Sequence, residues 1–371
     1  MQSITLFLGG DVMTGRGIDQ ILPHPCVPDL YERWVQHADD YVELAERRSG
    51  PVPRPAGFDY IWGDALEELG RRAPDLRIVN LETSITTSPR YQADKGIHYR
   101  MNPRNVPCLT AAGIDCCVLA NNHVLDWGVE GLLETLGSLE GALVDTTGAG
   151  RHRAAAARPA ILPLPGGIRL LVFAYAMPSS GVPATWAATE DRPGVNLLRD
   201  ASPRSVDRVA ADVDAHRRAG DLVLISVHWG GNWGYAIPDE HVTLARALVD
   251  RAGVNAVHGH SSHHPLAVEI HRNRPLIYGC GDLLNDYEGI RGYEAFRSDL
   301  TFMYFPVFDP RTGELTEFTL TPMRICRFRL NRCTREDVAW LQARLAEQSR
   351  AFGVGVVEQD GRLALRWGAD G

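Results

Sequence analysis

The sequence predicts an α/β fold with mixed sheets and a functional site at the carboxyl ends of strands. Two observations predict it. Short apolar runs, typical of buried strands, alternate along the 371 residues with segments of helical periodicity. Several of these runs stop abruptly at polar side chains, most clearly in the stretch from Cys116 to His123. Open α/β sheets place their ligands at the carboxyl ends of strands, so a site is expected there.

The composition is that of an ordinary globular protein. Hydrophobic residues make up 44% of the chain, charged residues 23%, and the formal net charge is −8. This charge argues against a nucleic-acid partner. The N-terminus lacks a basic segment, and no apolar run reaches the roughly 18 residues of a membrane span. We therefore expect a cytoplasmic protein without a membrane partner. The seven cysteines form no CxxC pair, which indicates reduced thiols.

The N-terminal half predicts three strands that each end in polar residues. The strands are expected at residues 3–8, 77–81 and 114–120. The polar residues that follow them are Asp11, Glu82, and Asn122 with His123. Helices are expected at residues 62–72, 106–112 and 132–141. A turn residue remains an alternative reading of Asp11, and a helix cap an alternative for Asn122 or Asp126.

Two segments of this half are predicted to lie outside the sheet. Residues 20–60 are rich in proline and contain one short helix near 41–48, so they predict an insertion over the sheet edge or the site. Residues 86–104 are loop-like and carry Lys95, His98 and Arg100 within six positions. Such a group predicts an anion clamp for a carboxylate or phosphate. An exposed strand is an equal alternative.

The C-terminal half repeats the pattern of apolar runs with polar ends. A hairpin at 160–174 and a lid at 177–200 come first, followed by a helix at 205–219. The strands at 221–227 and 254–257 end in His228 and in the cluster of His258, His260 and His263. A helix lies between them at 242–252, and further strands are expected at 266–270, 276–278, 300–308 and 315–323. Residues 1–330 are predicted to form one domain, and residues 331–371 a C-terminal helix and tail.

Five strand ends therefore carry hard oxygen or imidazole donors. One polar strand end is unremarkable, but five in a sheet-like series predict a metal site. A buried cluster of this kind without a cation would carry unpaired charge at considerable cost in free energy.

These residues together resemble the signature of the calcineurin-like metallophosphoesterases. The segments resemble the CapA-like branch of that superfamily, which is named for poly-γ-glutamate capsule synthesis. They are Gly10-Asp-Val-Met13, Asn80-Leu-Glu82, Ala120 to Asp126, Lys95 to Arg100, Val227-His228-Trp-Gly, Gly259 to His263 and Tyr278 to Asp282. The resemblance covers about residues 3–308. It implies a four-layer α/β/β/α sandwich with the site at the carboxyl ends of strands.

The chain departs from the phosphoesterase pattern at two ligand positions. The superfamily begins with Asp-x-His, whereas this chain has Asp11-Val-Met13. The bridging Asp of its second motif is replaced by Glu82. The loss of a nitrogen ligand argues for one divalent cation of the oxygen-preferring kind, Ca²⁺, Mg²⁺ or Mn²⁺. No organic cofactor is expected.

The resemblance also implies roles for individual residues. The expected metal ligands are Glu82, Asn122, His228, His258 and His263. The expected acid–base groups are Asp11, His123, Asp126 and His260, although the division of labour within the 258–263 cluster stays undecided. The expected substrate-binding residues are Lys95, His98, Arg100, Trp229, Trp233 and Tyr235. For the three aromatic residues, a place in the core is the alternative.

Four functions are compatible with these residues. The first is hydrolysis of a phosphate ester, with His123 protonating the leaving oxygen. The second is handling of a capsule polymer, and the third is proton transfer at a peptide carbon. The CapA-like branch includes an enzyme that epimerises the C-terminal residue of a lasso-peptide precursor. We predict this third function, an L-to-D epimerisation on a peptide substrate, ahead of phosphoester hydrolysis. A metal-stabilised binding module without catalysis is the fourth.

Overall fold

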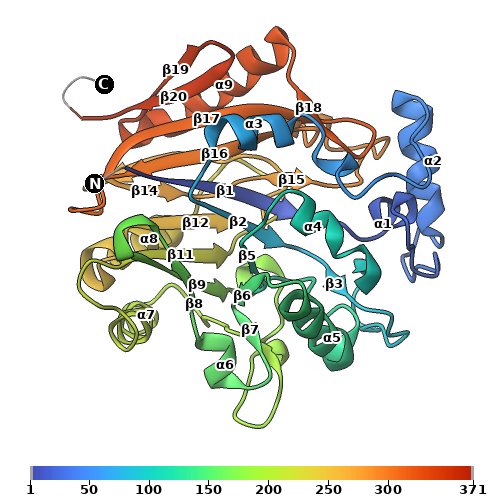
Figure 1. Ribbon diagram of the computed structural model, residues 1–371, viewed down its shortest axis with the longest axis horizontal. Helices are drawn as coiled ribbons and strands as arrows, with labels where there is room; N and C mark the ends of the chain where they lie inside the picture. The colour runs from blue at the N-terminus through green and yellow to red at the C-terminus, as the bar shows by residue number, and fades with distance from the viewer. Residues whose placement is uncertain (1–2, 369–371) are drawn as a thin grey trace.

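The computed structural model describes residues 3–368, in which two large β-sheets face each other (Figure 1). The larger sheet has ten strands. Its main path runs through β19 (Gly355–Gln359), β20 (Arg362–Arg366), β17 (Leu315–Ile325), β16 (Leu300–Phe308), β1 (Ile4–Val12), β2 (Leu76–Leu81), β5 (Cys116–Val118) and β6 (Asp145–Thr147). Two short strands join beside it, β15 (Asp282–Leu284) on β1 and β18 (Leu330–Arg332) on β17.

The smaller sheet has six strands. Their order is β13 (Val268–His271), β14 (Arg274–Ile277), β12 (Ala256–His260), β11 (Leu222–His228), β9 (Arg169–Ala176) and β8 (Ala160–Pro163). Two ribbons of two strands accompany the sheets: β7 (Ala149–Gly150) with β10 (Gly194–Val195), and β3 (Ser84–Ile85) with β4 (Arg100–Met101). Both large sheets contain parallel and antiparallel pairs, as expected for mixed sheets.

Helices pack around the two sheets. They are α1 (Gly17–Ile21), α2 (Ala38–Ser49), α3 (Ala65–Arg72), α4 (Pro107–Ala111), α5 (Gly128–Gly141), α6 (Arg153–Ala157), α7 (Pro203–Asp214), α8 (Asp239–Ala252) and α9 (Arg335–Ser349). In Figure 1, α7 and α8 lie beside the six-stranded sheet, while α3 lies over the ten-stranded sheet on the opposite side of the molecule. This arrangement confirms the predicted four-layer α/β/β/α sandwich.

Side-chain alternation along the strands explains the layers. In β9, Leu171 and Phe173 pack with the helices α7 and α8, whereas Leu170 and Val172 belong to the core between the two sheets. Strand β9 is buried along nearly its whole length. Parallel strands covered on both faces are rich in apolar residues for this reason. The continuous apolar runs seen in the sequence are therefore strands buried from both sides.

The sheet register brings the carboxyl ends of separate strands together. β1 and β2 are parallel neighbours in one sheet, and β11 and β12 are parallel neighbours in the other. The two sheets meet at this end, where Nε2 of His258 lies 3.0 Å from the carbonyl oxygen of Gly9. Polar residues that follow these four strands consequently face a common space.

The segments outside the sheets show one difference from the sequence-based expectation. A helix followed by a tail was expected after residue 330, and α9 is that helix. The tail, however, contains the hairpin β19–β20, which extends the large sheet through the pairing of β20 with β17. Leu363 and Leu365 are buried by this pairing. A short hairpin gives only a weak sequence signal, because its stability comes from the sheet it joins.

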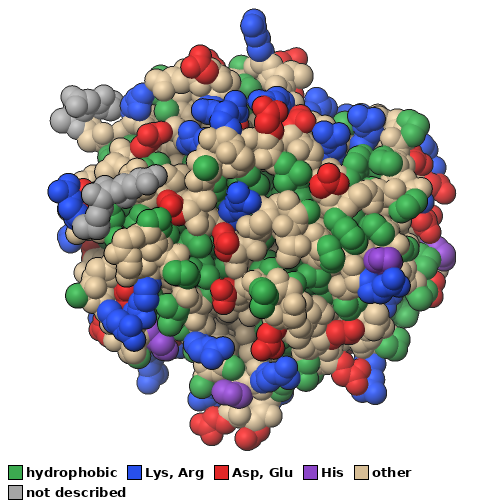
Figure 2. Space-filling model, in the orientation of Figure 1, with side chains coloured by type: hydrophobic (Ala, Val, Ile, Leu, Met, Phe, Trp, Pro, Cys, Tyr) green, Lys and Arg blue, Asp and Glu red, His purple; other side chains and the backbone are tan. Residues whose placement is uncertain are grey.

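On the face seen in Figure 2, acidic and basic side chains are interspersed. Among the described residues, no helix has the length and apolar character needed to cross a membrane.

Candidate metal centre

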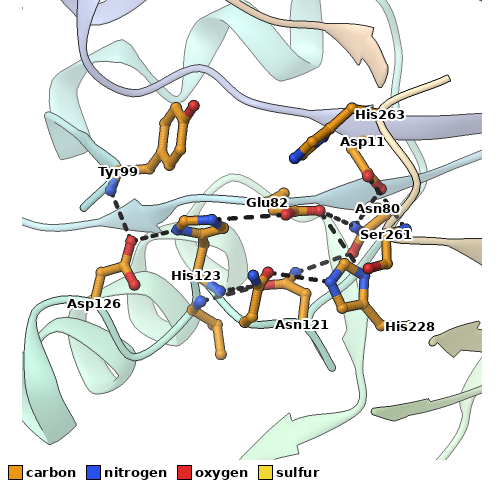
Figure 3. Close-up of polar contacts among 12 residues, drawn as sticks. Asp11, Asn80, Glu82, Tyr99, Asn121, His123, Asp126, His228, Ser261 and His263 are labelled. Carbon is orange, nitrogen blue, oxygen red and sulfur yellow. Dashed lines mark hydrogen bonds and ion pairs between the residues drawn. The ribbon is translucent and has the colours of Figure 1, made fainter. Parts of the chain in front are cut away.

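The centre of the site is a pair of carboxyl groups delivered by neighbouring strands. Asp11 lies near the end of β1 and Glu82 directly follows β2, and both are buried. The side chain of Asn80 joins them, since its Nδ2 lies 2.7 Å from Asp11 Oδ1 and 3.0 Å from Glu82 Oε2. The side-chain amide of Asn121 in turn donates to the side-chain oxygen Oδ1 of Asn80 at 3.0 Å. In Figure 3, Asn80 lies next to the two carboxyl groups and Asn121 lies below them.

A first group of metal donors lies beside these carboxyl groups. One ligand atom each from Asp11, His228 and His260 falls within 4.8 Å of the others, and all three residues are buried. The Nδ1 atoms of the two imidazoles lie 2.7 Å apart. Nδ1 of His228 also lies 3.9 Å from Glu82 Oε2. Carboxylate and imidazole donors that converge in this way fit a divalent cation.

The outer nitrogens of these two imidazoles have partners of their own. Nε2 of His228 lies 3.1 Å from the amide oxygen of Asn122, an atom that can only accept a hydrogen bond. Nε2 of His260 lies 2.8 Å from the Ser226 hydroxyl. Such partners fix the tautomer of a metal-ligating histidine and leave the other nitrogen free to bind. Both Nδ1 atoms are thereby available to a cation, and Asn122 orients His228.

A second donor group shares Asp11 with the first. Its members are Asp11, His263 and Asp282, which are buried and again have ligand atoms within 4.8 Å. Nδ1 of His263 lies 2.8 Å from Asp282 Oδ1. In Figure 3, His263 and Asp11 lie on one side of Glu82, and His228 lies on the other. Asp282 was not among the predicted site residues, although the segment Tyr278–Asp282 was part of the family resemblance.

The charges of this cluster call for a cation. No Lys or Arg within residues 3–368 forms an ion pair with Asp11, Glu82 or Asp282. Burial, with the nearby Asp282, raises the pKa of Asp11 to about 7. Burial and the proximity of Asp11 also raise the pKa of Glu82 well above its usual value. Carboxylates that repel each other in a buried space are stabilised by a bound divalent ion, so the residues present fit such an ion.

A separate acid–base pair, His123 with Asp126, faces these donors. Nδ1 of His123 lies 2.6 Å from Asp126 Oδ2, and Nε2 points toward Glu82, whose Oε1 is 3.8 Å away. The backbone N–H of Tyr99 donates to the same Asp126 oxygen at 2.7 Å. Burial lowers the pKa of His123 to about 4, and Lys95 contributes in the same direction against the effect of Asp126. His123 is therefore neutral at pH 7, with a basic nitrogen that faces the metal donors.

A cleft of about 1030 Å³ is lined by α2, by the segment 285–299 and by residues 324–326 and 334–337. Two of its lining residues contact His263: Trp233, whose ring centroid is 5.2 Å from that of His263, and Tyr287, whose hydroxyl is 3.4 Å from His263 Nε2. The predicted insertion, which contains α2, thus lines a cleft that lies next to His263.

The predicted anion clamp is not formed as expected. Lys95 is directed inward, where its ammonium group contacts Asp126 and the Asn122 carbonyl. Arg100 lies over the ring of Trp127 and donates to the carbonyl oxygens of Ser88 and Val27. His98 is buried with Nε2 against the Gln92 carbonyl. These placements correct the prediction that the three residues converge on one anion, because Lys95 and Arg100 are already paired with the surrounding chain and His98 is turned toward the Gln92 carbonyl.

Three other predicted site residues also lie away from the donors. Trp229 is in the core, stacked on His241, and donates to the Tyr278 carbonyl. Tyr235 packs against His264 and Phe296. His258 contacts Gly9 and Ser226 and belongs to neither donor group. Its position in β12 is two residues from His260, so its side chain shares a face with His260 but lies deeper between the sheets.

No role was predicted from the sequence for several residues that support the site. Asn80 was seen only as part of a motif, yet it joins Asp11 to Glu82. The ring of Tyr99 lies edge-on against His123, with centroids 4.7 Å apart, and its hydroxyl is 3.4 Å from that of Tyr287. No local pattern marks such tyrosines, because they reach the site only through long-range packing.

The chain is similar to several known proteins. A probable polyglutamine synthesis accessory protein of Mycobacterium tuberculosis is 48% identical over 361 residues, which cover 97% of this chain and 95% of the relative. The PGA biosynthesis protein CapA of Bacillus subtilis is 26% identical over 278 residues, covering 75% of this chain and 62% of that protein. A phosphatase structure from Mycoplasma pneumoniae matches 91% of this chain at 12% identity, with a TM-score of 0.46.

The family model for bacterial capsule synthesis proteins, PGA_cap, matches residues 5–287. That segment contains both donor groups and the acid–base pair. The match confirms the predicted CapA-like branch, and the chain belongs to the bacterial capsule synthesis protein PGA_cap family.

Proposed function

We propose that this protein is a metal-dependent enzyme that cleaves amide bonds in a glutamate-containing polymer. The observation that carries the proposal is the acid–base pair: Nδ1 of His123 is held by Asp126, while Nε2 faces the metal donors. The names of the relatives, which refer to PGA and polyglutamine synthesis, support the choice of polymer.

In this proposal Asp11, His228 and His260 hold the metal, and Glu82 lies beside them. A bound divalent cation supplies Lewis acidity, which polarises a carbonyl and makes water more acidic. Imidazole and carboxylate donors suit Mn²⁺ and related ions. The donors themselves are kept in place by Asn80, Asn122 and Ser226.

His123 transfers the proton in both steps of the proposed hydrolysis, the attack of water and the release of the amine. As the water oxygen bonds to the carbonyl carbon, Nε2 of His123 accepts a proton from the water. As the carbon–nitrogen bond breaks, the same nitrogen returns that proton to the leaving amine. Asp126 stabilises the positive imidazole between these events, and its own pKa lies below the usual value because His123 and Lys95 outweigh the effect of burial.

The cleft beside His263 provides room for an extended chain. It is open along α2 and the 287–299 segment, and the rim carries Arg48 and Arg291. The lining also carries Glu294, whose pKa is lowered by hydrogen bonds to the backbone and by the charges of Arg291 and Arg48. In this proposal the two arginines meet the carboxylates of a glutamate polymer.

Mass spectrometry of a purified poly-γ-glutamate sample in H₂¹⁸O tests the proposal. With the Mn²⁺-loaded protein, we expect shorter chains in which each new carboxyl end carries one ¹⁸O atom. The His123→Ala protein is the matched control. Chains of unchanged length with the wild-type protein would contradict the proposal, as would equal cleavage by the control.

Epimerisation at Cα, the function predicted from the sequence, is a second candidate. The observation that favours it is a second imidazole, His263, which faces the centre from the side opposite His228 (Figure 3) and pairs with Asp282. A two-base epimerase needs one proton-transfer group on each face of the carbon. The same assay in D₂O separates the two candidates, because epimerisation places deuterium at Cα without shortening the chain.

A further inference from the structure

Arg16 is a buried residue with an unusual backbone conformation, shortly after the end of β1. Its exposed fraction is 3%, and its backbone angles are φ 48° and ψ −120°. Residues other than glycine rarely adopt a positive φ, and this conformation costs free energy. It persists only where the surrounding structure holds the residue in place. The partners of Arg16 therefore indicate what the strained backbone maintains.

Polar and aromatic side chains enclose the guanidinium group of Arg16. Its Nε lies 3.1 Å from Asp286 Oδ2, and its Nη2 contacts the other oxygen of the same carboxylate. Its Nη1 lies 3.1 Å from Glu32 Oε1 and 3.0 Å from the Tyr41 hydroxyl. The rings of Tyr41 and Tyr99 lie against the group, with centroids 3.9 Å and 4.3 Å from Cζ. This arrangement uses the planar fork of arginine, which the point charge of a lysine does not reproduce.

The carboxylate partners come from two segments that are far apart in the sequence. Glu32 belongs to the insertion, and Tyr41 belongs to α2, which the insertion contains. The Tyr41 hydroxyl also donates to Glu32, so these two residues are joined to each other as well as to Arg16. Asp286 directly precedes Tyr287, which lines the cleft. Arg16 therefore ties two walls of the cleft to the end of β1.

Net stabilisation does not account for this arrangement. Replacement of a buried ion pair by apolar side chains is often neutral or stabilising, so such a pair is weak evidence for stability. Here two buried carboxylates and one guanidinium are combined with a strained backbone at a single point. Their shared effect is to fix the place of the segments that they join.

We propose that Arg16 is a positioning residue that holds the α2 wall of the cleft at a fixed place relative to the metal donors. The inference rests on the proposed function, because it takes the cleft as the place where the polymer binds. Arg16 does not line the cleft and belongs to neither donor group. It acts through Tyr41, which lies one helical turn from the cleft residue Leu44. Loss of the fork should therefore weaken polymer binding and leave the metal in place.

Steady-state kinetics with poly-γ-glutamate and hydrogen exchange, both on the Mn²⁺-loaded protein, test this inference. In Arg16→Lys we expect KM for the polymer to rise by roughly 10-fold or more, because a misplacement of about 1 Å can cost roughly 10²-fold. Both kcat and the Mn²⁺ content should keep their wild-type values. Backbone amides of α2 should exchange faster than in the wild-type protein, whereas those of β11 should not. Tyr41→Phe, which removes one hydroxyl and keeps the ring, should cause the same changes to a smaller extent.

Two substitutions of the same kind are matched controls. Arg169→Lys alters another arginine whose fork holds a carboxylate, that of Asp221. Tyr60→Phe removes a hydroxyl that donates to the Arg327 carbonyl. These contacts do not involve Arg16, so both proteins should keep the wild-type KM and the wild-type exchange in α2.

The inference is overturned if KM is unchanged in Arg16→Lys and in Tyr41→Phe. A lower Tm with unchanged KM would show that Arg16 is structural only. Unchanged exchange in α2 would overturn the inference as well, because α2 would then keep its place without the fork. A wild-type protein that leaves the polymer intact would contradict the proposed function alone, since hydrogen exchange reports on α2 without any substrate.

Discussion

The site contains two buried imidazole–carboxylate pairs of nearly equal geometry. We call His123 with Asp126 the acid–base pair, and His263 with Asp282 the ligand pair. Their nitrogen–oxygen distances are 2.6 Å and 2.8 Å. Their neighbours differ in charge: the ammonium group of Lys95 contacts the acid–base pair, whereas the carboxyl group of Asp11 adjoins the ligand pair.

The difference appears in the two imidazoles. Burial lowers the pKa of His123 to about 4, and Lys95 adds to this effect. Burial opposes charge on His263 as well, but Asp282 and Asp11 outweigh it and raise its pKa above the usual value. Lys95 therefore already supplies a positive charge to the acid–base pair. The ligand pair, in contrast, lies among carboxyl groups that attract a cation. The same two side-chain types fit the proposed proton transfer in the first setting and cation binding in the second.

The largest expected effect is on catalysis by the acid–base pair. His123→Ala should lower the rate of polymer cleavage by roughly 10²–10⁴-fold, the usual contribution of a positioned acid–base group. The number of bound Mn²⁺ ions should stay the same, because His123 belongs to neither donor group. The two quantities are measured by initial rates and by elemental analysis. A lost ion in this variant would place His123 among the ligands and remove the distinction between the pairs.

A smaller effect is expected when the carboxylate of the acid–base pair is neutralised. Asp126→Asn keeps the shape of the side chain but no longer favours the proton on Nδ1 of His123. We expect a loss of roughly 10–100-fold in cleavage rate, as for other groups that orient a reacting histidine. Rates that equal those of the wild-type protein across pH 6–9 would show that Asp126 is structural only.

Metal removal should destabilise the protein in a pH-dependent manner. In the metal-free fold, burial and the nearby Asp282 raise the pKa of Asp11 from the usual range of an aspartate to about 7. Protonated Asp11 therefore contributes to the free energy of unfolding. This contribution is complete below about pH 4 and is lost as the pH rises through about 7. The bound metal offsets this loss. Chelation should therefore lower Tm more at pH 8 than at pH 5, as scanning calorimetry measures.

Equal shifts of Tm at the two pH values would mean that the buried carboxyl groups are not the metal ligands. The Asp11→Asn protein provides the control. The dependence of Tm on pH should be weaker in its metal-free form, because one of the two buried carboxyl groups with a raised pKa has been removed and only Glu82 remains.

The smallest effect is expected at Met13. If Asp282 already fills the ligand position beside Asp11, Met13→His should change Mn²⁺ stoichiometry very little. We also expect slow turnover of p-nitrophenyl phosphate by the wild-type protein, and at most a modest gain in the variant. Rapid wild-type turnover near the enzyme median of about 10 s⁻¹ would instead favour a phosphoesterase.

Much of the site followed from local sequence patterns. Apolar runs predicted the strands, and Asp11, Glu82 and His228 lie together because the carboxyl ends of strands share an edge. Asp282 was missed because β15 spans only three residues and owes its place to pairing with β1. The orientation of Arg100 and Trp229 could not be predicted either. It depends on the ring of Trp127 and on the core between α8 and the sheet, which no short segment encodes.

Anomalous diffraction at the manganese edge tests the division of roles between the two pairs most directly. Crystals equilibrated with Mn²⁺ should show two peaks, both in contact with Asp11. One should touch His228 and His260, and the other should touch the ligand pair. No peak is expected at the acid–base pair. A peak bound to His123 or Asp126, or no peak at Asp282, would contradict the account.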